Sequence, residues 1–210
     1  MLNVFRTSLT LMMLFAFLSS VSARNYDEGI EYKKLRAPVA TQVEAGKIEV
    51  VELFWYGCPH CFRLEPDINK WLKNKPKNVE FIRIPAIFNK TWELHAKAYY
   101  TADFLGILEK FHKPFFDAMH IKKQRLNNAS AVKAFFIEQG VSEKDFDSTF
   151  NSFAVDAKVR RAKELSKRYG ISGVPALVVN GKYLTDGPMA GGRQGMIKVL
   201  NHLIKMESDK

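Results

Sequence analysis

The two cysteines of the chain, Cys58 and Cys61, lie close together directly after a strongly apolar stretch. Residues 48–56 (IEVVELFWY) are rich in β-branched and aromatic side chains, which predicts a buried strand that ends at Gly57. A disulfide between Cys58 and Cys61 would close a very short loop and would remove little entropy from the unfolded chain. The pair is therefore poorly placed to stabilise a fold and well placed for redox chemistry.

A helix is predicted over residues 59–72, because Pro59 fits the first turn of a helix and Pro66 is compatible with a kink. Residues 79–84 (VEFIRI) alternate as a second strand. A strand, a helix and a strand in this order are expected to form a right-handed unit with parallel strands. The first cysteine then stands at the junction of strand and helix.

Apolar spacing predicts that the middle of the chain is helical. The predicted helices cover residues 94–105, 108–119, 130–139, 142–150 and 155–169, with Ser130 and Ser142 as N-caps. The sheet resumes with a strand over residues 176–179, a hairpin turn at Asn180-Gly181 and a return strand over residues 182–185. A final helix is predicted over residues 195–206.

The position of Cys58 predicts an acidic thiol. The first turn of a helix has free backbone N–H groups and the positive end of the helix dipole, and both stabilise a thiolate. His60, as a cation or a hydrogen-bond donor, would add to this effect, and the thiolate is the reactive form. Cys61, one turn further on, can pair with Cys58 or attack a mixed disulfide formed there. Stabilising the thiolate favours the dithiol form and makes the disulfide a stronger oxidant.

Half of a zinc site is the alternative for such a cysteine pair, and it would need two more ligands. The chain has no other cysteine, and its remaining histidines show no paired spacing: His95, His112, His120 and His202. We therefore expect no metal and no bound cofactor.

The first 23 residues have the pattern of a cleavable signal peptide. The apolar run over residues 9–18 is too short to span a membrane comfortably, and compact residues precede a cleavage site after Ala23. An uncleaved anchor is the alternative. Export would place Cys58 and Cys61 in an oxidising compartment, where a disulfide can form and persist.

Two further features bear on a site. Val174-Pro175 precedes the strand over residues 176–179, where a cis peptide bond is plausible and an ordinary trans proline is the alternative. Trp55 and Tyr56 are candidate substrate contacts, although burial in the strand explains Trp55 equally well. The net charge of +10 is spread over the helices without a basic stripe, which favours a solvated surface over nucleic-acid or membrane binding.

Four segments together resemble the DsbA-type periplasmic thiol:disulfide oxidoreductases of the thioredoxin superfamily: NYDEGIEYKKL, VVELFWYGCPHCFRLEP, NSFAVDAKVRRA and GVPALVVNGKY. The resemblance covers nearly all of the chain after the signal peptide. It implies an α/β fold, thioredoxin-like, with an inserted all-helical domain. The thioredoxin-like parts would cover residues 24–88 and 169–210, and the helical domain residues 89–168.

The resemblance also implies roles for single residues. Cys58 matches the exposed nucleophile and Cys61 its buried partner, while Pro59 and His60 match the dipeptide that tunes them. Two more positions match the substrate-binding loop, with Pro175 as the cis-proline and Val174 as the residue before it. The backbone there is expected to pair with a substrate peptide as an added strand.

Glu52 matches an acidic residue that lies beneath the active site in this family, usually beside a buried lysine. Arg83 falls at the corresponding place on the next strand, and arginine does not easily give up its charge. This departure favours a permanent ion pair over a proton-transfer role for Glu52. A purely structural ion pair is an open alternative.

The function implied is donation of the Cys58–Cys61 disulfide to reduced, partly unfolded exported proteins in the periplasm. The family further implies that a DsbB-type, quinone-linked membrane oxidase reoxidises the pair. A disulfide isomerase or reductase is one alternative, although isomerases of this compartment usually carry an added N-terminal dimerisation domain. Only about 25 residues lie between the signal peptide and the first predicted strand, which favours a monomeric oxidase. A non-enzymatic peptide-binding chaperone with an incidental cysteine pair is another.

Overall fold

The structure is a computed structural model that describes residues 26–210, so the expected signal peptide over residues 1–23 lies outside the described residues. The strands of the described part form a sheet with the order β1 (Lys33–Lys34), β5 (Tyr183–Asp186), β4 (Ala176–Val179), β2 (Ile48–Phe54) and β3 (Val79–Pro85). β2 pairs in parallel with β3 and antiparallel with β4. The predicted parallel unit around the cysteine pair is thus confirmed.

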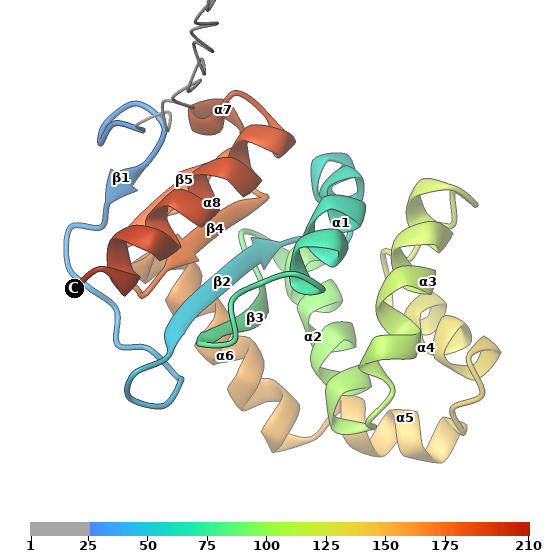
Figure 1. The fold of residues 1–210 in the computed structure, drawn as a ribbon. Helices are drawn as coiled ribbons and strands as arrows, with labels where there is room; N and C mark the ends of the chain where they lie inside the picture. The colour runs from blue at the N-terminus through green and yellow to red at the C-terminus, as the bar shows by residue number, and fades with distance from the viewer. Residues whose placement is uncertain (1–25) are drawn as a thin grey trace, which may run out of the picture.

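β2 is the central strand, and all of its side chains are buried, including Glu49 and Glu52. Helices cover both faces of the sheet: α1 (Pro59–Leu72) and α8 (Arg193–Ser208) lie in front of it and α6 (Phe153–Arg168) lies behind it in Figure 1. This double covering explains why β2 has a nearly continuous apolar sequence. It also makes any carboxylate on β2 costly unless it is paired.

The segment between β3 and β4 is helical. Its elements are α2 (Lys90–Phe104), α3 (Leu108–His120), α4 (Ala129–Glu138), α5 (Glu143–Phe150) and α6. α2 packs against the edge strand β3 and against α6, and α3 packs against α1. These contacts place the helical segment beside the start of α1, next to the cysteine pair (Figure 1). No helix among residues 26–210 is both long enough and apolar enough to cross a membrane.

The helix caps confirm one prediction and correct another. Ser142 caps α5, because its side chain accepts a hydrogen bond from the Asp145 amide at 3.1 Å. Ser130 does not cap α4. Asn128 takes that role with an extended backbone and accepts from the Ala131 amide at 2.8 Å, so the helix starts earlier than predicted. Asparagine caps at least as well as serine, and the sequence offered both.

The hairpin turn at Asn180-Gly181 is confirmed, with φ values of 51° and 60° that match the two left-handed positions of a tight turn. β5 begins one residue later than predicted and α8 two residues earlier. The sequence analysis missed β1 and the short helix α7 (Gly187–Ala190). A strand of two residues and a helix of one turn are too short to show a hydrophobic period.

Gly181 gives a test of how this hairpin is held. Its φ is +60°, and an added Cβ would lie 1.9 Å from the Val39 carbonyl oxygen. We expect Gly181→Ala to lower the free energy of unfolding by about 3 kcal/mol, from backbone strain and overpacking together. Gly140→Ala is the control, because Gly140 also has a positive φ but open space around it. Strain alone should cost Gly140→Ala about 1 kcal/mol.

Urea denaturation monitored by circular dichroism measures both values. Equal losses in the two variants would show that the contact with Val39 contributes nothing.

Candidate functional site

Cys58 is the N-cap residue of α1, with an extended backbone (φ −88°, ψ 117°). The turn before it is fixed by a hydrogen bond from the Cys58 amide to the Trp55 carbonyl at 3.0 Å. The helix begins directly after it, where the Phe62 amide donates to the Cys58 carbonyl at 3.1 Å. Gly57 is required in this turn, because a Cβ there would lie 2.2 Å from the Trp55 ring.

The pKa values of the two cysteines are shifted in opposite directions. A hydrogen bond from the Cys61 thiol and the backbone N–H groups of Cys61 and His60 outweigh the effect of burial and lower the pKa of Cys58 to about 6. Burial and the neighbouring Cys58 thiolate raise the pKa of Cys61 well above its ordinary range. Cys58 is 7% exposed and Cys61 is completely buried. One reactive thiolate and one protected thiol therefore lie side by side.

The loop before β4 meets this pair. The Val174–Pro175 peptide bond is cis, as the sequence analysis expects. The Cys58 sulfur lies 3.4 Å from the Val174 carbonyl oxygen, to which Cys58 donates when it is protonated. The sheet register produces this contact, because Ala176 pairs with Leu53 near the end of β2. Segments more than 100 residues apart thus form one site.

A groove of about 610 Å³ adjoins the loop and the start of α1. Its lining residues come from α1, the cis-proline loop, α7 and α8: His60, Arg63, Ser172, Gly173, Val174, Pro175, Asp186, Gly187, Pro188, Gly192, Arg193 and Met196. His60 is exposed, and Arg63 donates to its Nδ1 at 3.0 Å, while Pro59 is also exposed beside it. The sequence analysis missed this groove, because nothing in the chain indicates where α7 and α8 meet the loop.

The burial of Trp55 and Tyr56 bears on their interpretation as substrate contacts. Tyr56 is completely buried, so that interpretation is wrong for Tyr56. Trp55 is half-buried and stacks on Trp92 with ring centroids 4.4 Å apart. Its indole N–H donates to Nδ1 of His95 at 2.9 Å. Trp55 thus supports the turn that carries Cys58.

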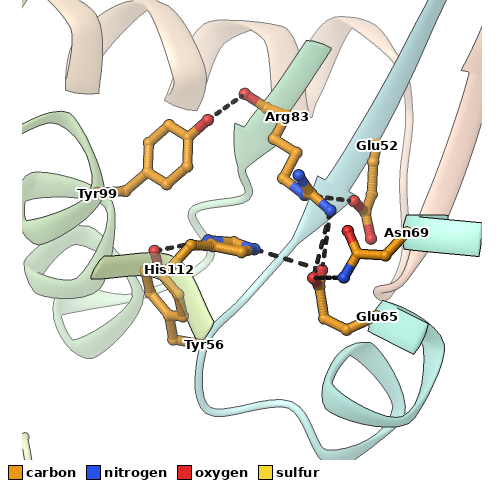
Figure 2. Close-up of polar contacts among 7 residues, drawn as sticks. All are labelled: Glu52, Tyr56, Glu65, Asn69, Arg83, Tyr99 and His112. Carbon is orange, nitrogen blue, oxygen red and sulfur yellow. Dashed lines mark hydrogen bonds and ion pairs between the residues drawn. The ribbon is translucent and has the colours of Figure 1, made fainter. Parts of the chain in front are cut away.

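Glu52 and Arg83 lie opposite each other on β2 and β3, and Arg83 Nε donates to Glu52 Oε2 at 3.0 Å. Figure 2 shows that the guanidinium of Arg83 also reaches Glu65 on α1. Complete burial, opposed by Arg83 and aided by the charge of Glu65, raises the pKa of Glu52 to about 7. The ion pair expected from the sequence is present, and burial opposes the ionisation of Glu52 within it.

The sequence analysis missed Glu65 and its neighbour His112 on α3. Glu65 follows Cys61 by four residues, so helical spacing could have placed it on the same face of α1. His112 gave no such signal, because its position depends on how α3 packs against α1. Within residues 26–210, no three His, Cys, Asp or Glu side chains lie where they could bind one metal ion.

Known proteins resemble this chain in sequence and in fold. A family model described as a DSBA-like thioredoxin domain matches residues 82–203. The thiol:disulfide interchange protein DsbA of Pseudomonas syringae pv. tomato is 42% identical over 190 residues, which are 90% of this chain and 88% of that protein. DsbA of Pseudomonas aeruginosa is 40% identical over 201 residues, 95% of each chain.

Solved structures are similar as well. The crystal structure of Pseudomonas aeruginosa DsbA has a TM-score of 0.81 and 41% identity and covers 87% of this chain and 94% of its own. The crystal structure of the oxidoreductase DsbA from Xylella fastidiosa has a TM-score of 0.82 and 29% identity and covers 88% of this chain and 99% of its own.

The acidity of Cys58 can be measured by ultraviolet absorbance of the thiolate in the reduced protein. We expect a transition near pH 6, because that is where Cys58 ionises. Cys58→Ser should abolish the transition. Cys61→Ala should move it upward, because the thiol hydrogen bond is the largest favourable contribution. A transition of the unmodified protein near the ordinary cysteine value of about 8.5 would contradict the assignment.

Proposed function

Because the chain belongs to the DSBA-like thioredoxin family and is a thiol:disulfide oxidoreductase, we propose that it donates a Cys58–Cys61 disulfide to reduced, partly unfolded exported proteins. The observation that carries the proposal is the placement of the two sulfurs, because Cys58 is the N-cap residue of α1 and Cys61 beside it is completely buried. A stabilised thiolate on Cys58 favours the dithiol form, so electrons flow from substrate thiols to this pair.

The reaction takes place in two exchanges. A substrate thiolate attacks Cys58 Sγ, the Cys58–Cys61 bond breaks, and Cys61 leaves as a thiolate that takes up a proton. A second substrate thiolate then attacks the substrate sulfur of the mixed disulfide and releases Cys58 as a thiolate. Two electrons pass from the substrate to the pair, the substrate gains a disulfide, and one of its two protons passes to solvent.

Exposure directs the first attack to Cys58, and the acidity of Cys58 favours the final exchange. Cys61 is completely buried, so an incoming thiolate reaches only Cys58. The low pKa of Cys58 makes it a good leaving group when the second substrate thiolate attacks. Pro59 starts the helix and His60 adds positive character beside the sulfur, so this dipeptide tunes the same leaving group.

Val174 and Pro175 hold the substrate backbone next to Cys58. A peptide joined to Cys58 Sγ lies within reach of the Val174 backbone, which is already 3.4 Å from that sulfur. It can pair as an added strand with the backbone of this loop, and the adjoining groove of about 610 Å³ can take its side chains. Main-chain hydrogen bonds of this kind are independent of sequence, which suits an enzyme with many unfolded substrates.

Glu52 exchanges a proton with Cys61. The charge of Glu52 contributes to the raised pKa of Cys61, so the two groups are coupled electrostatically. A carboxyl group that titrates near pH 7 can give a proton to the Cys61 thiolate when the disulfide opens. Arg83 orients this carboxyl group through its hydrogen bond to Oε2.

The location and the partners follow from the same proposal. The signal peptide directs the chain to the periplasm, where it acts as a monomer. Its thioredoxin-like parts, residues 24–88 and 169–210, carry the cysteine pair and the cis-proline loop, and residues 89–168 form the helical domain. A DsbB-type, quinone-linked membrane oxidase takes the electrons from Cys58 and Cys61 and restores the disulfide.

An oxidation assay with a fluorescent dithiol peptide and glutathione disulfide as terminal oxidant tests the proposal. We expect multiple turnovers from the unmodified protein and none from Cys58→Ser, because the remaining Cys61 is completely buried and has no partner for a disulfide. Cys61→Ser cannot form the disulfide. With glutathione disulfide and no peptide, its Cys58 should exchange with the glutathione disulfide, release one glutathione thiolate and keep the other glutathione as a stable adduct that mass spectrometry detects. The control Glu109→Gln, outside the cysteine site, should react at the normal rate.

Undiminished activity of Cys58→Ser in preventing aggregation, without peptide oxidation by the unmodified protein, would instead identify a chaperone. Repair of scrambled disulfides faster than oxidation of dithiols would identify an isomerase.

A further inference from the structure

A buried cluster of charged side chains lies behind the cysteine pair, and the reaction described above uses only part of it. It consists of Glu52 on β2, Arg83 on β3, Glu65 on α1 and His112 on α3 (Figure 2). It joins the frame of the sheet to the helical segment between β3 and β4. The proposed reaction does not involve Glu65 or His112.

Arg83 is shared between two carboxylates. Its Nε donates to Glu52 Oε2 at 3.0 Å, and its Nη2 lies 3.3 Å from each oxygen of Glu65. The other oxygen of Glu52, Oε1, is buried and has no hydrogen-bond partner. One permanent positive charge thus faces two acidic groups. The Arg83 charge therefore only partly balances a negative charge on Glu52.

His112 secures Glu65 in its ionised form. Tyr56 hydroxyl lies 2.8 Å from His112 Nδ1, and His112 Nε2 lies 3.3 Å from Glu65 Oε1. A neutral imidazole satisfies both contacts, with Nδ1 accepting from Tyr56 and Nε2–H donating to Glu65. Burial lowers the pKa of His112, which favours this neutral form.

Glu65 has donors for both oxygens, because Asn69 Nδ2 donates to its Oε2 at 3.4 Å. Burial pushes the pKa of Glu65 upward, but the His112 hydrogen bond and the Arg83 charge outweigh it and lower the pKa overall. Glu65 therefore stays ionised at the pH where Glu52 takes up its proton.

We propose that Glu65, held ionised by His112, is a positioning residue that lets Glu52 gain and lose a proton at neutral pH although its ion-pair partner is an arginine. Burial is the largest influence against the ionised form of Glu52, and Arg83 opposes it. A second carboxylate that competes for the same guanidinium, and repels a charge on Glu52, shifts the balance further toward the protonated form. The inference rests on the proposed exchange of a proton between Glu52 and Cys61.

The cluster also has access to water. A cavity of about 340 Å³ is lined by Glu65, Arg83, Tyr99 and His112, together with Asn69, Leu108, Glu109 and Lys113. The side chains of Arg83 and Glu65 are 17% and 12% exposed, whereas that of Glu52 is not exposed at all. The charged groups of Arg83 and Glu65 are therefore closer to solvent than the carboxyl group of Glu52.

The test is a titration of the glutamate carboxyl carbons by NMR in ¹³C-labelled protein, with the Glu52 signal assigned from Glu52→Gln. In the unmodified protein we expect Glu52 to titrate near pH 7. Glu65→Gln keeps the side-chain shape and removes the charge, so the Glu52 pKa should fall by about one unit or more. Glu109→Gln is the matched control, because Glu109 lines the same cavity without contacting Arg83.

An unchanged Glu52 titration in Glu65→Gln, or an equal shift in Glu109→Gln, would overturn the proposal. A merely structural role of Glu65 would change the melting temperature and leave the Glu52 titration in place.

His112→Phe provides a second, independent variant. It keeps an aromatic ring beside Phe54 and Phe116 but has no N–H donor for Glu65. We expect the Glu65 pKa to rise in this variant, and an unchanged value would remove His112 from the proposal. Neither titration depends on catalysis. A protein that fails to oxidise peptides would refute the proposed function while the titrations still decide this inference.

Discussion

The first turn of α1 leaves backbone N–H groups without partners inside the helix, and the sulfur of Cys58 is the group placed to use them. Together with the Cys61 thiol, these N–H groups bring the pKa of Cys58 down to about 6. The placement depends on β2, whose buried strand ends at Phe54 and turns sharply into the helix. A change in the length of that turn would move the sulfur off the helix axis and remove the stabilisation.

The sheet supplies the rest of the site from distant parts of the chain. The antiparallel pairing of β4 with β2 brings the Val174 carbonyl to 3.4 Å from Cys58. The parallel pairing of β3 with β2 places Arg83 opposite Glu52. The thioredoxin-like frame thus sets the cis-proline loop on one side of the sulfurs and the charged cluster on the other. The helical segment adds His112 to that cluster through the packing of α3 against α1.

Local signals in the sequence predicted the parts that local chemistry determines. The apolar run of β2, the bounds of α1 and the hairpin at Asn180-Gly181 follow from period and turn residues. The pairing of Glu52 with Arg83 was expected only from the family resemblance. The start of α4 was wrong because Asn128 and Ser130 are both good caps, and only the backbone conformation decides between them. Glu65 and His112 were missed because their meeting depends on how two helices pack, which no spacing in the chain records.

The stabilised thiolate makes a direct thermodynamic prediction. The folded pKa of Cys58 lies below its unfolded value of about 8.5, so its contribution to stability is present at higher pH and is lost as the pH falls through about 6. Only the dithiol form has this ionisation.

The most direct test is therefore the difference in unfolding free energy between the dithiol and disulfide forms, measured by urea denaturation at several pH values. The difference should change in favour of the dithiol form by about 1.4 kcal/mol per pH unit between about pH 6 and pH 8. A difference that does not vary over this range would contradict the claim that a stabilised Cys58 thiolate drives the chemistry.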